Sequence, residues 1–154
     1  VSCREGELAV TGEEVFRVAQ SRQILHVDDF CNECGNCATF CVHDGEPYLD
    51  KPRLYLEKRN FEQETDNAFY VAGTGRGWAI WRREGGRASR LHLNSDTGEM
   101  AFENELLSVS LSPDFQVRAL GLKEAFEGTF SLVRAAEMVM ILKGIITSLP
   151  FLPI

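Results

Sequence analysis

The sequence predicts an α+β protein, with a small cysteine-bearing module over residues 1–50. An antiparallel β-meander packed against a long C-terminal helix is expected to follow over residues 51–154. Three observations lead to this prediction. Four cysteines fall within eleven residues near the start of the chain. From residue 69 onwards apolar and polar residues alternate between glycine- and proline-containing turns, as is typical of strands. The last part of the chain changes to helical spacing.

The N-terminal module is expected to contain little regular structure besides short elements. Glu7 to Val10 favours a strand, and Glu13 to Ser21 favours a short helix. Residues 23–28 alternate and carry branched side chains, which predicts a strand that leads into the cysteines. Turn residues then place the module boundary near residue 50.

Six strands are expected after this boundary, joined by tight turns. They span residues 69–71, 78–83, 88–93, 100–103, 107–111 and 115–120. In the fifth strand, leucines and a valine alternate with serines, so one face of the sheet should be dry and the other wet. From about Lys123 to Ser148 apolar residues recur at helical spacing, and Pro150 ends the run. This helix is expected to lie across the dry face.

The clustered cysteines have the spacing C-x2-C-x2-C-x3-C, which holds iron–sulfur clusters in bacterial ferredoxins. They are Cys31, Cys34, Cys37 and Cys41. Three thiolates at two-residue intervals can come from one loop that bends tightly around a side of a cluster. Gly35 tolerates such a bend because it lacks a Cβ. Cys41 lies four residues beyond Cys37, about one helical turn along the same face.

Other interpretations of the cysteines stay open. Disulfides fit poorly, because the chain has five cysteines and neighbours two residues apart are badly placed to bridge. Zinc usually takes two separated C-x2-C pairs, whereas this chain has one group of cysteines. The fifth cysteine, Cys3, has no partner at ligand spacing and is expected to be a buried thiol. His26 and His43 are expected to be hydrogen-bonded structural residues.

Charge and hydropathy limit the other classes of function. The net charge of −7 and the scattered basic residues argue against nucleic acid as a partner. No apolar stretch is long enough to span a membrane, and the first residues lack the parts of a signal peptide, so a cytoplasmic location is expected. The glycines of residues 73–77 favour a hairpin over a nucleotide-binding loop, because Trp78 replaces the small residue that such a loop requires. No catalytic residue is assigned.

A longer stretch of the module goes beyond the general cysteine pattern. Residues 23–41, followed by Pro47-Tyr-Leu-Asp-Lys51, resemble the C-terminal, ferredoxin-like region of the "putative selenate reductase" family. Members of that family are large flavin-dependent oxidoreductases similar to the small subunit of glutamate synthase. The resemblance also takes in the last helix and the Ser-Leu-Pro-Phe-Leu-Pro sequence near the end of the chain.

The resemblance implies two [4Fe-4S] clusters held by two cysteine motifs. Cys31, Cys34 and Cys37 would bind one cluster, and Cys41 would reach the other. The second motif, which lies upstream in that family, is absent from this sequence, and Val42 stands where a proline usually follows the fourth cysteine. FAD and NAD(P) would be bound by upstream flavoprotein domains of a longer parent chain.

The implied function is electron relay. The [4Fe-4S] region would pass single electrons between a flavin of the parent oxidoreductase and a partner protein or substrate site, without being catalytic on its own. One alternative is a structural module in which a metal pins a docking surface without redox turnover. Another is a catalytic pocket within residues 51–154. Redox inertness would favour the structural module, and a small molecule bound on the sheet would favour the catalytic pocket.

Overall fold

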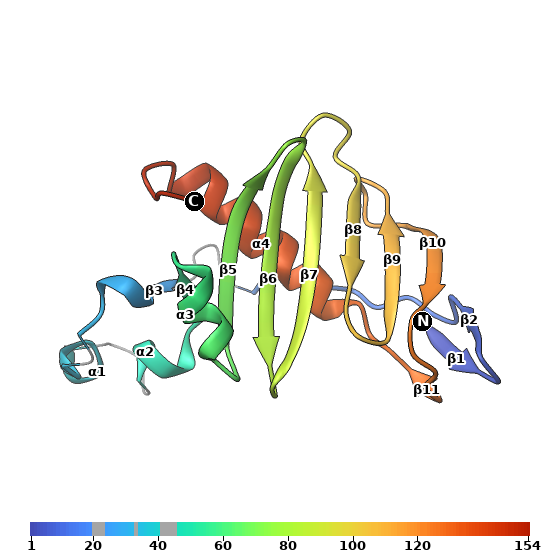
Figure 1. The fold of residues 1–154 in the computed structure, drawn as a ribbon, viewed down its shortest axis with the longest axis horizontal. Helices are drawn as coiled ribbons and strands as arrows, with labels where there is room; N and C mark the ends of the chain where they lie inside the picture. The colour runs from blue at the N-terminus through green and yellow to red at the C-terminus, as the bar shows by residue number, and fades with distance from the viewer. Residues whose placement is uncertain (20–23, 33, 41–45) are drawn as a thin grey trace.

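The structure, a computed structural model, describes residues 1–19, 24–32, 34–40 and 46–154. Its strands are β1 (Ser2–Arg4), β2 (Glu7–Ala9), β3 (His26–Val27), β4 (Arg53–Tyr55), β5 (Ala68–Thr74), β6 (Gly77–Glu84), β7 (Arg87–Asn94), β8 (Met100–Glu103), β9 (Leu107–Leu111), β10 (Val117–Leu122) and β11 (Gly128–Thr129). Its helices are the 3-10 turn η1 (Asp28–Phe30), α1 (Asn36–Phe40), α2 (Pro47–Asp50), α3 (Lys58–Gln63) and α4 (Val133–Ser148). One large sheet backed by α4 dominates this arrangement (Figure 1).

The large sheet has the strand order β10-β9-β8-β7-β6-β5-β4-β3. Strands β5 to β10 form an antiparallel meander, in which each strand pairs with the next one along the chain. At one edge, β3 pairs with β4 and β4 with β5 in parallel, so the sheet is mixed. The glycine-rich residues 73–77 form the hairpin between β5 and β6. A Cβ at Gly77 would lie 2.1 Å from the carbonyl oxygen of Leu93, so this hairpin requires a glycine for the close approach of the two backbones.

One face of the meander is apolar and forms the core together with α4. A row of directly paired, buried side chains crosses five strands of this face. The row consists of Val71, Ile80, Leu91, Phe102 and Val109. The alternation in β9 is confirmed, because Leu107, Val109 and Leu111 are buried whereas Ser110 is exposed.

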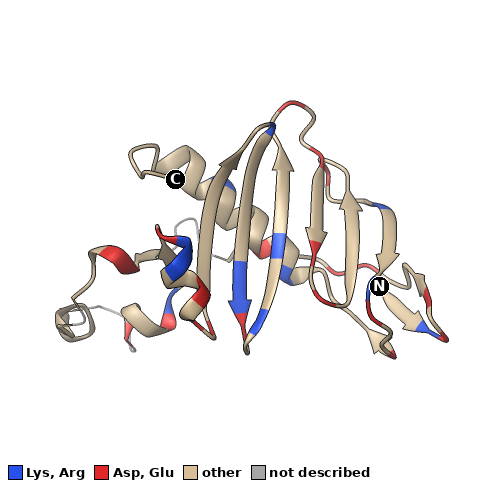
Figure 2. Cartoon of the chain, viewed as in Figure 1, with Lys and Arg blue, Asp and Glu red and all other residues tan. Residues whose placement is uncertain are grey.

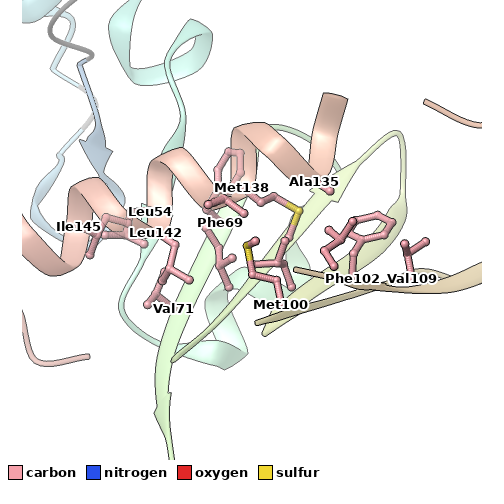
Figure 3. Packing of buried hydrophobic residues seen from close by; sticks show 14 of the residues in the cluster. Leu54, Phe69, Val71, Met100, Phe102, Val109, Ala135, Met138, Leu142 and Ile145 are labelled. Carbon is pink, nitrogen blue, oxygen red and sulfur yellow. The ribbon is translucent and has the colours of Figure 1, made fainter. Parts of the chain in front are cut away.

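Helix α4 lies across this apolar face and contacts β6 and β7 (Figure 3). One side of the helix points into the core and the other faces outwards. The core side carries four side chains that are at most 1% exposed, those of Ala135, Met138, Leu142 and Ile145, whereas Met140 is 47% exposed. Leu54 of β4 belongs to the same core cluster, so the parallel edge of the sheet is packed together with the meander.

Two helices differ from the sequence-based expectation. Helix α4 begins at Val133 rather than near Lys123, because β10 continues to Leu122 and β11 follows it. Phe126 and Phe130, which suggested helical spacing, instead pack on the core from the segment between β10 and α4. The expected helix over residues 13–21 is absent from its described part, residues 13–19. Its apolar side chains are largely exposed, and a short helix without tertiary packing is marginal in water.

The expected boundary near residue 50 falls between α2 and β4. Strand pairing crosses it, because β3 pairs with β4, and because β1 pairs with β11 in a small second sheet of order β11-β1-β2. The first pairing extends the large sheet and the second forms a separate sheet, and both contribute few residues to the core. Independent folding of residues 51–154 stays a prediction, and its test is given below.

A charged network ties α4 to the sheet. Arg82 of β6, which is only 7% exposed, donates hydrogen bonds to Glu137 of α4 at 2.7 Å and to Glu84 at 2.8 Å. Arg134 of α4 contacts the same two carboxylates. Figure 2 marks the basic and acidic residues along the ribbon. Burial raises the pKa of Glu137, but the hydrogen bonds from Arg82 and Arg134 outweigh it, so the pKa lies below the usual glutamate value.

Glu137 should therefore make the fold sensitive to acid. A carboxylate whose pKa is lowered by folding contributes stability above its unfolded pKa, about 4.3, and this contribution is lost as the pH falls through the folded-state pKa. We expect Glu137→Gln to lower the urea midpoint at pH 7 and to flatten its decrease between about pH 5 and pH 3. Glu105→Gln is the control, because among the described residues Glu105 forms an ion pair with the exposed Arg87 alone. Equal effects of the two substitutions would contradict this role.

Candidate functional site

The cysteine-bearing segment projects from the parallel edge of the large sheet, at the opposite end of the molecule from β1 and β2 (Figure 1). The chain leaves the sheet through β3 and η1, forms α1, and returns through α2 to β4. Cys31 follows η1 and is half-buried, whereas Cys34 and Cys37 are exposed. Cys41, the fourth predicted ligand, lies outside the described residues, as does His43.

The backbone of the cysteine loop is shaped by local hydrogen bonds. The side-chain oxygen of Asn32 accepts a hydrogen bond from the backbone N–H of Cys34 at 3.3 Å. Gly35 follows with a φ of 73°, a left-handed conformation that favours glycine. Apart from its chain neighbours, no described residue has an atom within 4 Å of the place where a Cβ of Gly35 would stand, so glycine is favoured here by backbone conformation rather than by lack of space. Its carbonyl then accepts the first hydrogen bonds of α1, which carries Cys37.

The described cysteines do not meet at one point. Within the part of the chain that the structure describes, no three Cys, His, Asp or Glu side chains gather closely enough to hold a metal ion. By its chemistry the donor set fits an iron–sulfur cluster, since three thiols from one loop are accompanied by a fourth cysteine at ferredoxin spacing. Metal binding and local folding are commonly coupled, so the thiols of a metal-free loop need not lie together beforehand.

The N-terminal flank of the loop is held to the sheet by two aspartates. The carboxylate of Asp28 accepts hydrogen bonds from Nε and Nη2 of Arg53, at 3.2 and 3.1 Å. Asp29 accepts a hydrogen bond from the backbone N–H of Leu56 at 2.7 Å. The carbonyl of Asp28 in turn accepts the N–H of Cys31 at 2.8 Å, so the anchored turn is bonded directly to the first cysteine.

The C-terminal flank is held by Asn67, in the turn before β5. Its side-chain amide donates hydrogen bonds to the carbonyl oxygens of Leu49, at 2.8 Å, and Lys51, at 2.6 Å. Asn67 has a φ of 49°, a conformation that asparagine tolerates better than most residues. Its own carbonyl accepts the backbone N–H of Arg53, so both flanks are anchored at one place on the sheet edge.

Arg53 and Asn67 were not identified by sequence analysis. Their partners lie 25 and 16–18 positions away, and no local pattern indicates such contacts.

The expected strand over residues 23–28 is shorter than predicted, since it covers His26 and Val27 before η1 begins at Asp28. The prediction that His26 is hydrogen-bonded is wrong for its Nε2 atom, which is buried and has no hydrogen-bond partner among the described residues. This Nε2 atom lies 3.9 Å from the carboxylate of Asp28.

Cys3 lies far from the loop, in β1, where it is fully buried. It pairs across the strands with Leu8 and Gly128. The expectation of a buried thiol at this position is confirmed. Among the described residues, Cys3 belongs to no group of three or more side chains that could hold a metal ion.

Comparison with known proteins relates about a third of the chain to an oxidoreductase. Over 49 residues it is 45% identical to the protein named "Putative oxidoreductase YgfK" of Escherichia coli, in both strain K12 and O157:H7. The matched stretch covers 32% of this chain and only 5% of the length of those relatives. No protein-family model matches the chain, and no solved structure matches it. The chain is therefore similar to a small part of a protein that is named as an oxidoreductase.

Across the described ranges, no helix combines the length and the apolar character needed to cross a membrane.

Proposed function

We propose that Cys31, Cys34, Cys37 and Cys41 bind iron–sulfur clusters of the [4Fe-4S] type, and that the segment relays electrons within a larger flavin-dependent oxidoreductase. The observation that carries this proposal is the ferredoxin spacing of four cysteines on a loop anchored to a sheet edge. The partial homology to a protein named as an oxidoreductase supports the redox aspect. FAD and NAD(P) would bind to other domains of the parent protein.

The chain's own residues would hold the cluster and keep it accessible. A bound cluster supplies one-electron transfer, and the thiolates of Cys31, Cys34 and Cys37 would ligate three of its irons. Cys34 and Cys37 lie at the surface, where a second redox centre can approach. Phe30 and Phe40, next to the first and fourth cysteines, are 70% and 81% exposed, so the loop offers apolar surface beside the thiols.

The metal content of the parent protein tests this proposal. Purified without oxygen, it should be brown and contain iron and acid-labile sulfide, and reduction should produce an EPR signal. In the 154-residue chain alone we expect a labile or incomplete cluster, or none, because the family resemblance assigns Cys41 to a second cluster. Stoichiometric zinc without sulfide would rule out electron relay and would favour a structural module in which the metal pins a docking surface.

A further inference from the structure

The two flanks of the cysteine loop converge on one place at the sheet edge. Asp28 and Lys51, which bracket the loop, are 23 positions apart in the sequence. Arg53 of β4 holds Asp28, and Asn67 holds the carbonyl of Lys51. The backbone hydrogen bond between Arg53 and Asn67 joins these two anchors. The loop is therefore closed at its base by the sheet, independently of any bound metal.

The surroundings of Arg53 hold its guanidinium in one position. The side chain is only 14% exposed, and its guanidinium lies 5.3 Å from the centre of the Tyr55 ring. A second carboxylate, that of Glu64, lies 3.4 Å from Nη1. A guanidinium held by stacking and by two carboxylates has little freedom, so it fixes the direction of Asp28 and of the following Cys31.

Closure at the base changes the cost of binding a metal. Bringing several thiolates together orders the loop, and this conformational entropy opposes metal binding. A loop whose ends are already fixed has lost part of that freedom before the metal arrives. Groups that orient metal ligands without touching the metal commonly contribute about 10–100-fold to its affinity.

We propose that Arg53 and Asn67 are positioning residues, which hold the cysteine loop closed at its base for metal binding. This inference rests on the proposed metal-binding function of the cysteines. It assigns to the sheet edge a role in loading the metal, through Asp28 on one side and Leu49 and Lys51 on the other.

The test uses the whole 154-residue chain and cobalt(II), whose coordination by thiolates produces characteristic absorption. Arg53→Met removes the first anchor. Asn67→Gly removes the second and keeps a residue that accepts a positive φ. Arg90→Met is the matched control, because Arg90 also stacks on an aromatic ring, that of Trp81 at 5.1 Å, and also pairs with a carboxylate, that of Glu103.

We expect Arg53→Met to raise the dissociation constant of cobalt about tenfold and Arg90→Met to leave it nearly unchanged. Arg53→Lys, which keeps the charge, should recover part of the affinity. The direction of this change separates a positioning effect from a charge effect. Removal of a positive charge near the loop would by itself favour cation binding and lower the dissociation constant. Tighter binding by Arg53→Met, or equal effects of Arg53→Met and Arg90→Met, would overturn the positioning role.

Amide hydrogen exchange of the metal-free chain provides a second readout. Arg53→Met should speed exchange at Cys31 and Leu56, and Asn67→Gly should speed it over residues 46–50. Unchanged exchange rates in both variants would overturn the positioning role of Arg53 and Asn67, whatever the measured affinity for cobalt. Absence of iron and acid-labile sulfide from the parent protein would instead overturn the proposed metal-binding function, so the two failures are distinguishable.

Discussion

Replacement of Cys34 by serine is expected to remove most of the iron and acid-labile sulfide from the parent protein. Cys34 lies in the middle of the three-cysteine loop, between the Asn32 turn and Gly35. A serine hydroxyl is a poor substitute for a thiolate as a ligand of iron–sulfur clusters, which are held by cysteine thiolates. Iron and sulfide analysis measures the loss, together with the visible absorption of the reconstituted protein.

Cys3→Ala is the matched control for this substitution. Alanine is preferable to serine at this position, because Cys3 is fully buried and a hydroxyl there would need a hydrogen-bond partner. The variant should keep the iron content of the unsubstituted protein, since β1 lies at the far end of the molecule from the loop. Loss of iron on substitution of Cys3, or its retention on substitution of Cys34, would show that the ligands are wrongly assigned.

Replacement of Leu142 by alanine is expected to destabilise the sheet by about 3 kcal/mol, which is the usual size of such a loss in a packed core. Leu142 of α4 is fully buried in the core cluster between the helix and the sheet, so the smaller side chain leaves a cavity there (Figure 3). Urea unfolding, followed by circular dichroism, measures the change. Met140→Ala on the exposed side of the same helix should cost less than about 0.5 kcal/mol.

The same unfolding experiment tests whether the meander depends on the metal. The core cluster draws its fully buried residues from β4 to β9 and from α4, together with Leu152, and none of them is a cysteine. In the 154-residue chain, we therefore expect residues 51–154 to unfold at the same urea midpoint with and without iron. The loss of stability in Leu142→Ala should also be the same in both conditions. Collapse of all secondary structure in the absence of iron would show that the boundary near residue 50 is wrong.

Strands of the meander could be located from the sequence because their signal is local. Alternation over four to eight residues, with a turn at each end, determines both the extent of a strand and its buried face. All six predicted strands overlap β5 to β10, although residues 115 and 116 lie before β10. The start of α4 was misplaced because Phe126 and Phe130 happen to have helical spacing, and spacing cannot separate a helix from a core-packed loop.

The parallel edge of the sheet had no comparable signal. Strands β3 and β4 have two and three residues, too few to show a period, and they exist because the chain returns to pair beside β5. The shorter strand before the cysteines has the same cause. Asp28 leaves the extended conformation where its carboxylate accepts hydrogen bonds from Arg53, 25 positions later.

The identity and order of the candidate ligands were determined by the sequence alone, because the reach of a thiolate around a cluster depends on the number of residues between cysteines. Tertiary structure decided where that loop stands and how it is held. The hydrogen bonds of Arg53 and Asn67 join segments distant in the sequence, and they form only once β4 and β5 pair. Such contacts depend on the packing of the whole sheet, and no short stretch of residues encodes them.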